Sequence, residues 1–328
     1  SNKNDSTSLS ENNVINIYED SKKNIWVAVY GGGLNLLNKK SNTFTRYRHQ
    51  NSNRTSISSD KVYSIFEDSR NRLWIGTHGG GLNLFNPLTG TFRRFEYDAS
   101  NPNGLPSNEL YAIGEDDEHN LWIGTENAGL SIFNLHTEVF NNYLHDEMDN
   151  SSLANNSIYT AYKDRKGNMW VGTFAGGVNL FNKDYNEFNH YKHTSSPNSL
   201  SQNNVLSITE DRQKKIWIGT DGGGLDLFDP VTKNFTHFKH EEGNKKSICG
   251  NYVLNVCADS KGNLWIGTWG DGVTVYNPKK NSWKHFKNNP EDPFSLSSNN
   301  AWVIYEDQEK KIWIGTHGGG LNLYNPGT

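Results

Sequence analysis

A tetrapeptide, Trp-Ile-Gly-Thr or a close variant of it, recurs along the whole chain at a nearly constant interval. Its seven copies begin at Trp26, Trp74, Trp122, Trp170, Trp217, Trp265 and Trp313, which gives spacings of 48, 48, 48, 47, 48 and 48 residues. Repetition at a fixed period of roughly 20–50 residues is typical of solenoids, propellers and related architectures. We therefore expect seven copies of one supersecondary unit.

Each copy contains four segments with the composition of β-strands. In the second copy these are residues 62–68, 73–77, 82–85 and 91–97, which are rich in β-branched and aromatic residues. Polar turns separate them, and the turn at 78–81, His-Gly-Gly-Gly, tolerates positive φ. Four antiparallel strands in this period match a propeller blade, whereas helical repeats would show a 3.6-residue periodicity. The sequence predicts an all-β fold, a single seven-bladed β-propeller over residues 1–328 with four-stranded antiparallel blades.

The last blade differs from the others in its strand count. Fourth strands begin near Phe44, Phe92, Phe140, Phe188, Phe235 and Trp283, but none follows Tyr324. Residues 1–13 resemble only the polar connector that precedes a blade. We expect a three-stranded last blade that lacks its outer strand and has an exposed edge. Both ends of the chain are interpreted as points within a longer polypeptide.

Charge and cysteine content exclude some classes of function. With 32 basic and 36 acidic residues the net charge is -4, and the two signs are interspersed, so direct contact with nucleic acid is not expected. Cys249 and Cys257 would lie about 26 Å apart in extended chain, which is too far for a local disulfide, so we expect free thiols. No run approaches the length of a transmembrane helix.

The motifs of the repeat point to a known family. Paired asparagines, a strand ending in Glu-Asp, then Leu-Trp-Ile-Gly-Thr, Gly-Gly-Gly-Leu and Asn-Pro resemble the two-component regulator propeller repeat, and all seven copies carry this pattern. Similar proteins are typically the periplasmic sensor regions of hybrid two-component systems of gut Bacteroidetes. There, one or two propellers precede a β-sandwich, a membrane helix, a histidine kinase and a DNA-binding output. The resemblance implies a periplasmic sensor of polysaccharide-derived oligosaccharides, with a neighbouring propeller and β-sandwich, and it allows a homodimer.

Residues present in every blade are assigned to structure, because a shared residue cannot make an asymmetric site. This assignment covers the repeated tryptophans and glycines and the acid that ends each first strand, namely Asp20, Asp68, Asp116, Asp164, Asp211, Asp259 and Asp307. Such a carboxylate can accept backbone N–H bonds in the following turn. Function is expected where the copies differ, on loops that share one face around the channel.

Two sets of variable residues are the candidate ligand-binding positions. The turn set follows the tetrapeptide and consists of Tyr30, His78, Glu126, Phe174, Asp221, Trp269 and His317. The entry set precedes each first strand and consists of Asn13, Lys61, Glu109, Ser157, Asn204, Tyr252 and Asn300, of which Lys61, Glu109 and Tyr252 are retained as candidates together with Trp302. Nearby Tyr63, Tyr111, Tyr159 and Trp302 either pack between blades or line the site.

Three functions remain open from these residues. Aromatic planes mixed with carboxylates and imidazoles suit sugar recognition, which favours a non-catalytic binding and sensing module without a catalytic residue, cofactor or metal. A propeller lyase or hydrolase would instead use His78, Glu126, Asp221 and His317 as general base and metal ligands. A scaffold or dimerisation module is the third alternative.

Overall fold

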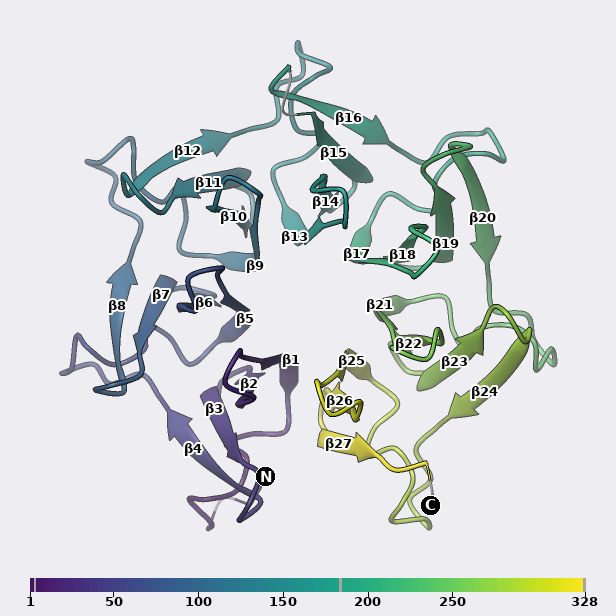
Figure 1. The fold of residues 1–328 in the computed structure, drawn as a ribbon, viewed down its shortest axis with the longest axis horizontal. Coiled ribbons are helices and arrows are strands. Elements are labelled where there is room, and N and C mark those ends of the chain that lie inside the picture. The colour runs from purple at the N-terminus through teal and green to yellow at the C-terminus, as the bar shows by residue number, and fades with distance from the viewer. Residues whose placement is uncertain (3, 183–184, 327–328) are drawn as a thin grey trace. The chain divides into compact units, whose positions relative to one another are not determined.

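The computed structural model describes residues 1–2, 4–182 and 185–326, and among these residues it contains 27 strands in seven antiparallel sheets (Figure 1). The fold class is therefore all-β, a seven-bladed β-propeller, as the sequence predicts. Nowhere in the described residues does a helix have the length and apolar character needed to cross a membrane.

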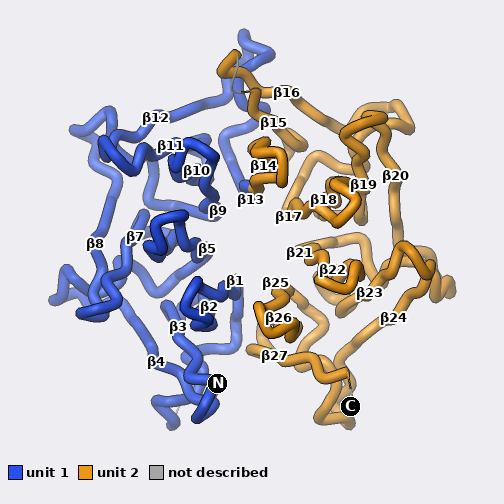
Figure 2. The backbone as a smooth tube through the Cα atoms, in the orientation of Figure 1, with its two compact units in different colours: residues 1–161 blue, residues 162–328 orange. Residues whose placement is uncertain are grey.

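The chain divides by its internal contacts into two compact units, residues 1–161 and 162–328 (Figure 2). The boundary falls within one strand, β13 (Ile158–Lys163), which begins the fourth sheet. The prediction of a single domain stays a prediction.

Unit 1 contains three complete four-stranded sheets, each with its strands in sequence order. Their bounds are β1 (Val14–Glu19), β2 (Ile25–Val29), β3 (Gly33–Asn38) and β4 (Thr43–Tyr47); β5 (Val62–Glu67), β6 (Leu73–Thr77), β7 (Gly81–Asn86) and β8 (Thr91–Phe95); and β9 (Leu110–Glu115), β10 (Asn120–Thr125), β11 (Leu130–Asn134) and β12 (Val139–Tyr143).

Unit 2 continues the same order of strands. The fourth sheet adds β14 (Met169–Thr173), β15 (Val178–Asn182) and β16 (Glu187–Tyr191). The next sheets are β17 (Val205–Glu210), β18 (Ile216–Thr220), β19 (Gly224–Asp229) and β20 (Asn234–Phe238); β21 (Val253–Ala258), β22 (Leu264–Thr268), β23 (Val273–Asn277) and β24 (Ser282–Phe286); and β25 (Ala301–Glu306), β26 (Ile312–Thr316) and β27 (Gly320–Tyr324).

The last sheet has three strands in the described part of the chain, which confirms the predicted lack of an outer strand. Its third strand, β27, is less covered than its counterparts: Leu323 is 48% exposed, whereas the corresponding Leu84 of β7 packs against a buried cluster. This strand lies at the edge of its sheet.

The core lies between neighbouring sheets, with the second strand of each blade buried on both faces. In β6 every residue is buried, and the Trp74 ring lies 5.9 Å from the Phe133 ring of the next blade in an edge-to-face contact. Gly76 is required by this packing, because a Cβ there would collide with Ser64 and lie 3.3 Å from Ile113 Cδ1.

The repeated acid has the structural role predicted for it. In all seven blades its Oδ2 accepts the indole N–H of the tetrapeptide tryptophan at 2.8–3.0 Å, in the pairs Asp20–Trp26, Asp68–Trp74, Asp116–Trp122, Asp164–Trp170, Asp211–Trp217, Asp259–Trp265 and Asp307–Trp313. The acid therefore satisfies the polar atom of a large core side chain.

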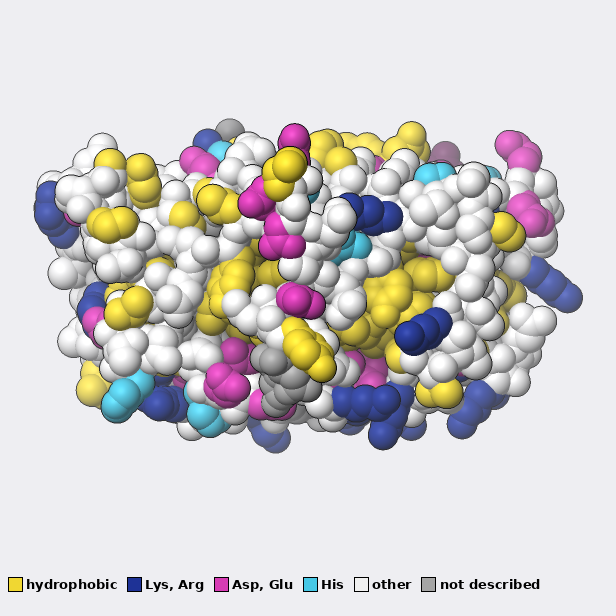
Figure 3. All heavy atoms as spheres, turned by 90° about the horizontal axis from the view of Figure 1, so that it is seen from above, with side chains coloured by type: hydrophobic (Ala, Val, Ile, Leu, Met, Phe, Trp, Pro, Cys, Tyr) yellow, Lys and Arg dark blue, Asp and Glu magenta, His cyan; other side chains and the backbone are white. Residues whose placement is uncertain are grey.

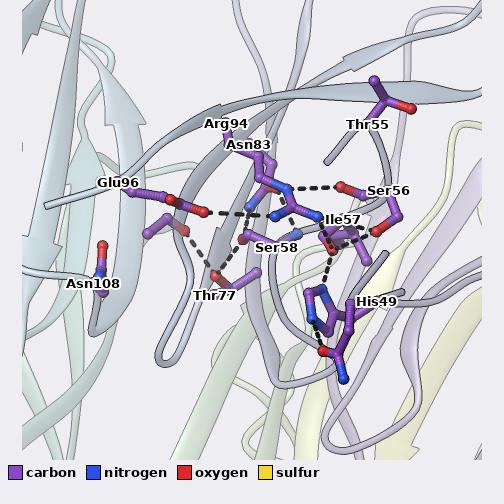
Figure 4. A network of polar contacts seen from close by, with 12 residues as sticks. His49, Thr55, Ser56, Ile57, Ser58, Thr77, Asn83, Arg94, Glu96 and Asn108 are labelled. Atoms are coloured by element: carbon purple, nitrogen blue, oxygen red, sulfur yellow. Dashed lines mark hydrogen bonds and ion pairs between the residues drawn. The ribbon is translucent and has the colours of Figure 1, made fainter. Parts of the chain in front are cut away.

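In the first two blades, the connector that precedes the blade is held by an arginine of that blade's own fourth strand. Arg94 Nε donates to the Ser56 carbonyl at 3.0 Å, and its Nη2 donates to Ser56 Oγ at 3.1 Å (Figure 4). In the first blade Arg46 Nε makes the same bond to the Ser8 carbonyl, at 2.9 Å. The N-terminal segment is thus a connector, as its sequence predicts.

The two cysteines are free thiols, Cys249 being buried and Cys257 partly buried, which confirms the sequence prediction. The surface seen in Figure 3 carries both acidic and basic side chains among uncharged ones, so neither sign alone covers it.

Candidate functional site

The backbone joins the turn set to the entry set. In six blades the amide of the turn residue donates to the carbonyl of the entry residue of its own blade at 2.9–3.0 Å, in the pairs Tyr30–Asn13, His78–Lys61, Glu126–Glu109, Asp221–Asn204, Trp269–Tyr252 and His317–Asn300. Three turn residues also form a β-bridge to the entry residue of the next blade: Tyr30 to Lys61, His78 to Glu109 and Asp221 to Tyr252. Variable side chains from adjacent blades are therefore brought together.

Unit 1 carries a row of aromatic rings behind these positions. The Tyr63 ring lies 5.9 Å from the Tyr30 ring and 4.8 Å from the Tyr111 ring, and Tyr111 lies 5.1 Å from Tyr159. The Lys61 ammonium lies 5.7 Å from the Tyr30 ring centroid, within cation–π range. The tyrosines pack between blades, the first of the two roles that the sequence left open.

His78 lies between two carboxylates of the third blade. Its Nδ1 is 2.8 Å from Glu109 Oε2, and its Nε2 is 3.4 Å from Glu126 Oε2. All three side chains are partly buried, with the imidazole 26% exposed and each carboxylate side chain 35% exposed. We call these three residues the His78 cluster; it could hold either a proton or a cation.

Burial and negative charge keep the adjoining phenols neutral. Burial, with Tyr30 and Glu126 adding to it, raises the pKa of Tyr63 to about 12. Burial also raises the pKa of Tyr111, and the negative charge of the nearby Glu126 carboxylate adds to the shift. Both phenols therefore stay protonated near neutral pH.

In unit 2, aromatic rings and an imidazole lie close together at the equivalent positions. The Trp269 ring lies 6.1 Å from Trp302 and 5.5 Å from His317, and Trp302 lies 6.3 Å from His317. Trp269 is 43% exposed and Tyr252, whose carbonyl accepts the Trp269 amide, is 53% exposed. We call Tyr252, Trp269, Trp302 and His317 the aromatic group; it offers exposed ring faces beside polar atoms.

Asp271 is a polar residue near this group that the sequence predictions missed. It occupies the third position of the turn, where the second and last blades have Gly80 and Gly319. A Cβ at Gly250 would collide with the Asp271 carboxylate, so the glycine leaves space for the acid. The departure from Gly-Gly-Gly in the turn was the signal in the sequence that could have revealed it.

Phe174 and Asp221, two further members of the turn set, belong to neither of these two groups. Phe174 is 45% exposed and precedes Ala175, whose amide donates to Asn204 Oδ1 at 2.8 Å. Asp221 belongs to unit 2 and bridges to Tyr252. Whether any member of the two sets contacts a ligand stays a prediction.

The architecture defines the chain as a seven-bladed β-propeller with its variable residues at the junctions of turns and strand entries. A model of the two component regulator propeller matches seven segments, residues 8–31, 56–79, 104–127, 152–175, 199–222, 247–270 and 295–318. These segments make up about half of the chain. The chain belongs to the two component regulator propeller family.

A solved extracellular domain has the same fold and detectable sequence similarity. It belongs to BT3049, a putative hybrid two component system of B. thetaiotaomicron, and is 26% identical over 97% of this chain with a TM-score of 0.81. The chain covers 40% of that domain. None of the curated proteins compared with the chain matches it.

Two further structures show the fold alone. Virginiamycin B lyase from Staphylococcus aureus is 12% identical with a TM-score of 0.69, over 97% of this chain and 96% of the lyase. PorZ of Porphyromonas gingivalis, a surface component of the type-IX secretion system, is 17% identical with a TM-score of 0.69, over 95% of this chain and 46% of PorZ.

Proposed function

We propose that this propeller is the periplasmic ligand-binding part of a hybrid two-component signalling protein and that it responds to polysaccharide-derived oligosaccharides. Membership of the two component regulator propeller family supports a sensor role, as does the similarity to the extracellular domain of BT3049. A propeller provides a rigid support on which loops can differ from blade to blade.

The observation that supports a carbohydrate as the ligand is the exposure of Trp269 within the aromatic group. A tryptophan that is 43% exposed beside Trp302 and His317 leaves apolar ring surface in contact with water. The apolar face of a sugar ring can cover such a surface, while hydroxyl groups need hydrogen-bond partners. His317 supplies an imidazole beside these rings, and Asp271 supplies a carboxylate two residues after Trp269 in the same turn.

Isothermal titration of the chain with a panel of oligosaccharides tests this function. We expect Trp269→Ala to weaken binding at least about tenfold, which corresponds to about 1.4 kcal/mol. Phe294→Ala is the matched control, because Phe294 is 80% exposed in a connector and lies outside the aromatic group. An oligosaccharide affinity that is unchanged by Trp269→Ala, by Asp271→Ala and by Glu126→Ala would contradict the proposed site.

A second candidate function is that of a propeller lyase or hydrolase, and the His78 cluster is the observation that favours it. An imidazole 2.8 Å from one carboxylate and 3.4 Å from another has the composition of a general acid–base site. Incubation with oligosaccharides followed by chromatography tests for cleavage, which His78→Gln would abolish. A chain that binds a glycan and leaves it intact removes this candidate.

The partners proposed for the intact protein are a further propeller, a β-sandwich and a second copy of the same protein. The chain spans 40% of the BT3049 extracellular domain, which leaves room for additional modules. Light scattering of the intact extracytoplasmic region would test the homodimer, with a monomer at every concentration as the contrary outcome.

A further inference from the structure

The His78 cluster is held in place by backbone bonds from two adjacent blades. His78 follows β6, and its backbone forms a β-bridge with Glu109, which precedes β9. Glu126 follows β10, and its amide donates to the Glu109 carbonyl at 3.0 Å. The three side chains therefore start from fixed neighbouring points, as a preformed binding site requires.

The donor atoms of the cluster are close enough to share one ion. His78, Glu109 and Glu126 each offer one ligand atom, and these atoms all lie within 4.8 Å of one another. Ligand atoms at about 2.0–2.2 Å from a metal ion lie roughly 3–4 Å apart, so small side-chain rotations would close the site. Among the described residues, this is the group of three His, Cys, Asp or Glu side chains with that spacing.

One oxygen of the cluster lacks a satisfactory partner in the protein. Glu109 Oε2 is withdrawn from solvent and receives no hydrogen bond of acceptable geometry, although His78 Nδ1 lies 2.8 Å from it. A buried carboxylate oxygen without a partner is costly, and a cation would satisfy it. This observation is independent of the spacing of the three residues.

We propose that His78, Glu109 and Glu126 bind a divalent transition-metal cation, with Zn²⁺ preferred over Mg²⁺ and Ca²⁺. An imidazole nitrogen with two carboxylate oxygens suits Zn²⁺, whereas Mg²⁺ and Ca²⁺ favour ligand sets made of oxygen alone. Three protein ligands leave an open position on the ion for water or a ligand group. The ion would link the second blade to the third.

The chain contains a matched control for this site. His317 lies in the same heptapeptide, His-Gly-Gly-Gly-Leu-Asn-Leu, as His78. Its imidazole packs near the Trp269 and Trp302 rings at 5.5 and 6.3 Å, in place of the two carboxylates. The two histidines thus share local sequence and turn and differ in their neighbours.

Titration of the EDTA-treated full chain with ZnCl₂, followed by calorimetry and elemental analysis, tests the proposal. We expect one Zn²⁺ per chain, affinity reduced at least about tenfold by His78→Gln and by Glu126→Gln, and no change with His317→Gln. MgCl₂ should bind more weakly than ZnCl₂. Thermal melting of the metal-free variants checks that each is folded, and Glu109→Gln replaces any variant that is not.

Two outcomes would overturn the proposal: no Zn²⁺ bound by the wild-type chain, or Zn²⁺ bound equally by the wild type and the folded His78→Gln, Glu126→Gln and Glu109→Gln variants. Oligosaccharide titration of the metal-free chain separates this result from the proposed function, because the aromatic group lies in unit 2 and the His78 cluster in unit 1.

Discussion

The indole nitrogen of Trp74 donates a hydrogen bond of 2.8 Å to Asp68 Oδ2, across a turn of five intervening residues. The other oxygen of Asp68 accepts the amides of Arg70 and Arg72, each at 2.9 Å. One buried carboxylate therefore fixes both the turn after β5 and the Trp74 ring of β6.

Asp68→Ala should lower the free energy of unfolding by about 2–4 kcal/mol, because it leaves a buried indole N–H and two turn amides without their acceptor. Urea unfolding followed by tryptophan fluorescence measures this change. Glu118→Ala, an exposed acid in the equivalent turn of the next blade, should change it by less than about 0.5 kcal/mol. Equal effects of the two substitutions would refute the structural role of Asp68.

Asp226 and His237 form an ion pair that should make stability depend on pH. His237 Nδ1 lies 2.6 Å from Asp226 Oδ1 and Nε2 lies 3.0 Å from the Pro197 carbonyl, so both ring nitrogens face acceptors. Burial lowers the pKa of His237, but its hydrogen bonds to Asp226 and Pro197 outweigh burial and raise it above its ordinary value of 6.5. Burial raises the pKa of Asp226, although its bonds to His237 and Ser201 oppose the shift.

The sign of the pH effect follows from these directions. A raised folded-state pKa means that His237 contributes stability that is full below pH 6.5 and is lost as pH rises through that raised value. Asp226 acts in the same sense at lower pH, since its pKa is raised above 3.8. Asp226→Asn introduces the residue type that four other blades have at this position, namely Asn35, Asn83, Asn179 and Asn322. This substitution should flatten the decline in the free energy of unfolding above pH 6.5. Unfolding curves between pH 5 and 9 give this slope, and an unchanged slope would contradict the pairing.

Gly250 and Asp271 should be coupled in stability. Gly250→Ser places a Cβ and hydroxyl against the Asp271 carboxylate and should cost about 1–3 kcal/mol. Ser59 and Gly80 occupy the equivalent positions in the second blade. Adding Asp271→Gly to Gly250→Ser gives the same serine and glycine pair, so the double variant should recover most of the lost stability. A double-mutant cycle by urea unfolding measures the coupling, and strict additivity would argue against the contact.

The two thiols should be unreactive in the folded chain. Burial raises the pKa of the Cys249 thiol and raises that of Cys257 to about 12, so little thiolate forms near pH 8. Titration with a disulfide reagent should modify neither cysteine until urea unfolds the chain, when both react. Rapid modification of one cysteine under native conditions would contradict this expectation.

The repeated positions made the fold predictable, and the same regularity limited what could be predicted of the site. Strand order, the three-stranded last sheet and the role of Asp68 all follow from residues that recur at a fixed period. Membership of the turn and entry sets was predictable for the same reason. Whether a ligand contacts them remains a prediction.

The neighbours of each variable residue could not be predicted from the repeat. His78 and His317 stand in identical heptapeptides, yet one faces Glu109 and Glu126 and the other faces Trp269 and Trp302. Glu109, Glu126 and Trp269 belong to an adjacent blade and Trp302 to the first strand of the His317 blade, so these neighbours are distant in sequence from the heptapeptide. Asp271 was missed because the prediction examined only the first position of each turn.

The β-bridges between a turn residue and the entry residue of the next blade, such as His78 with Glu109, have an evolutionary consequence. At each of the three bridged junctions one blade contributes the turn residue and the next blade contributes the entry residue, so a single substitution there alters the surroundings of residues in two blades. Insertion of a duplicated blade would break an established pairing and create two new ones. Diversification by blade duplication should therefore change binding chemistry in steps at junctions, while the buried strands remain interchangeable.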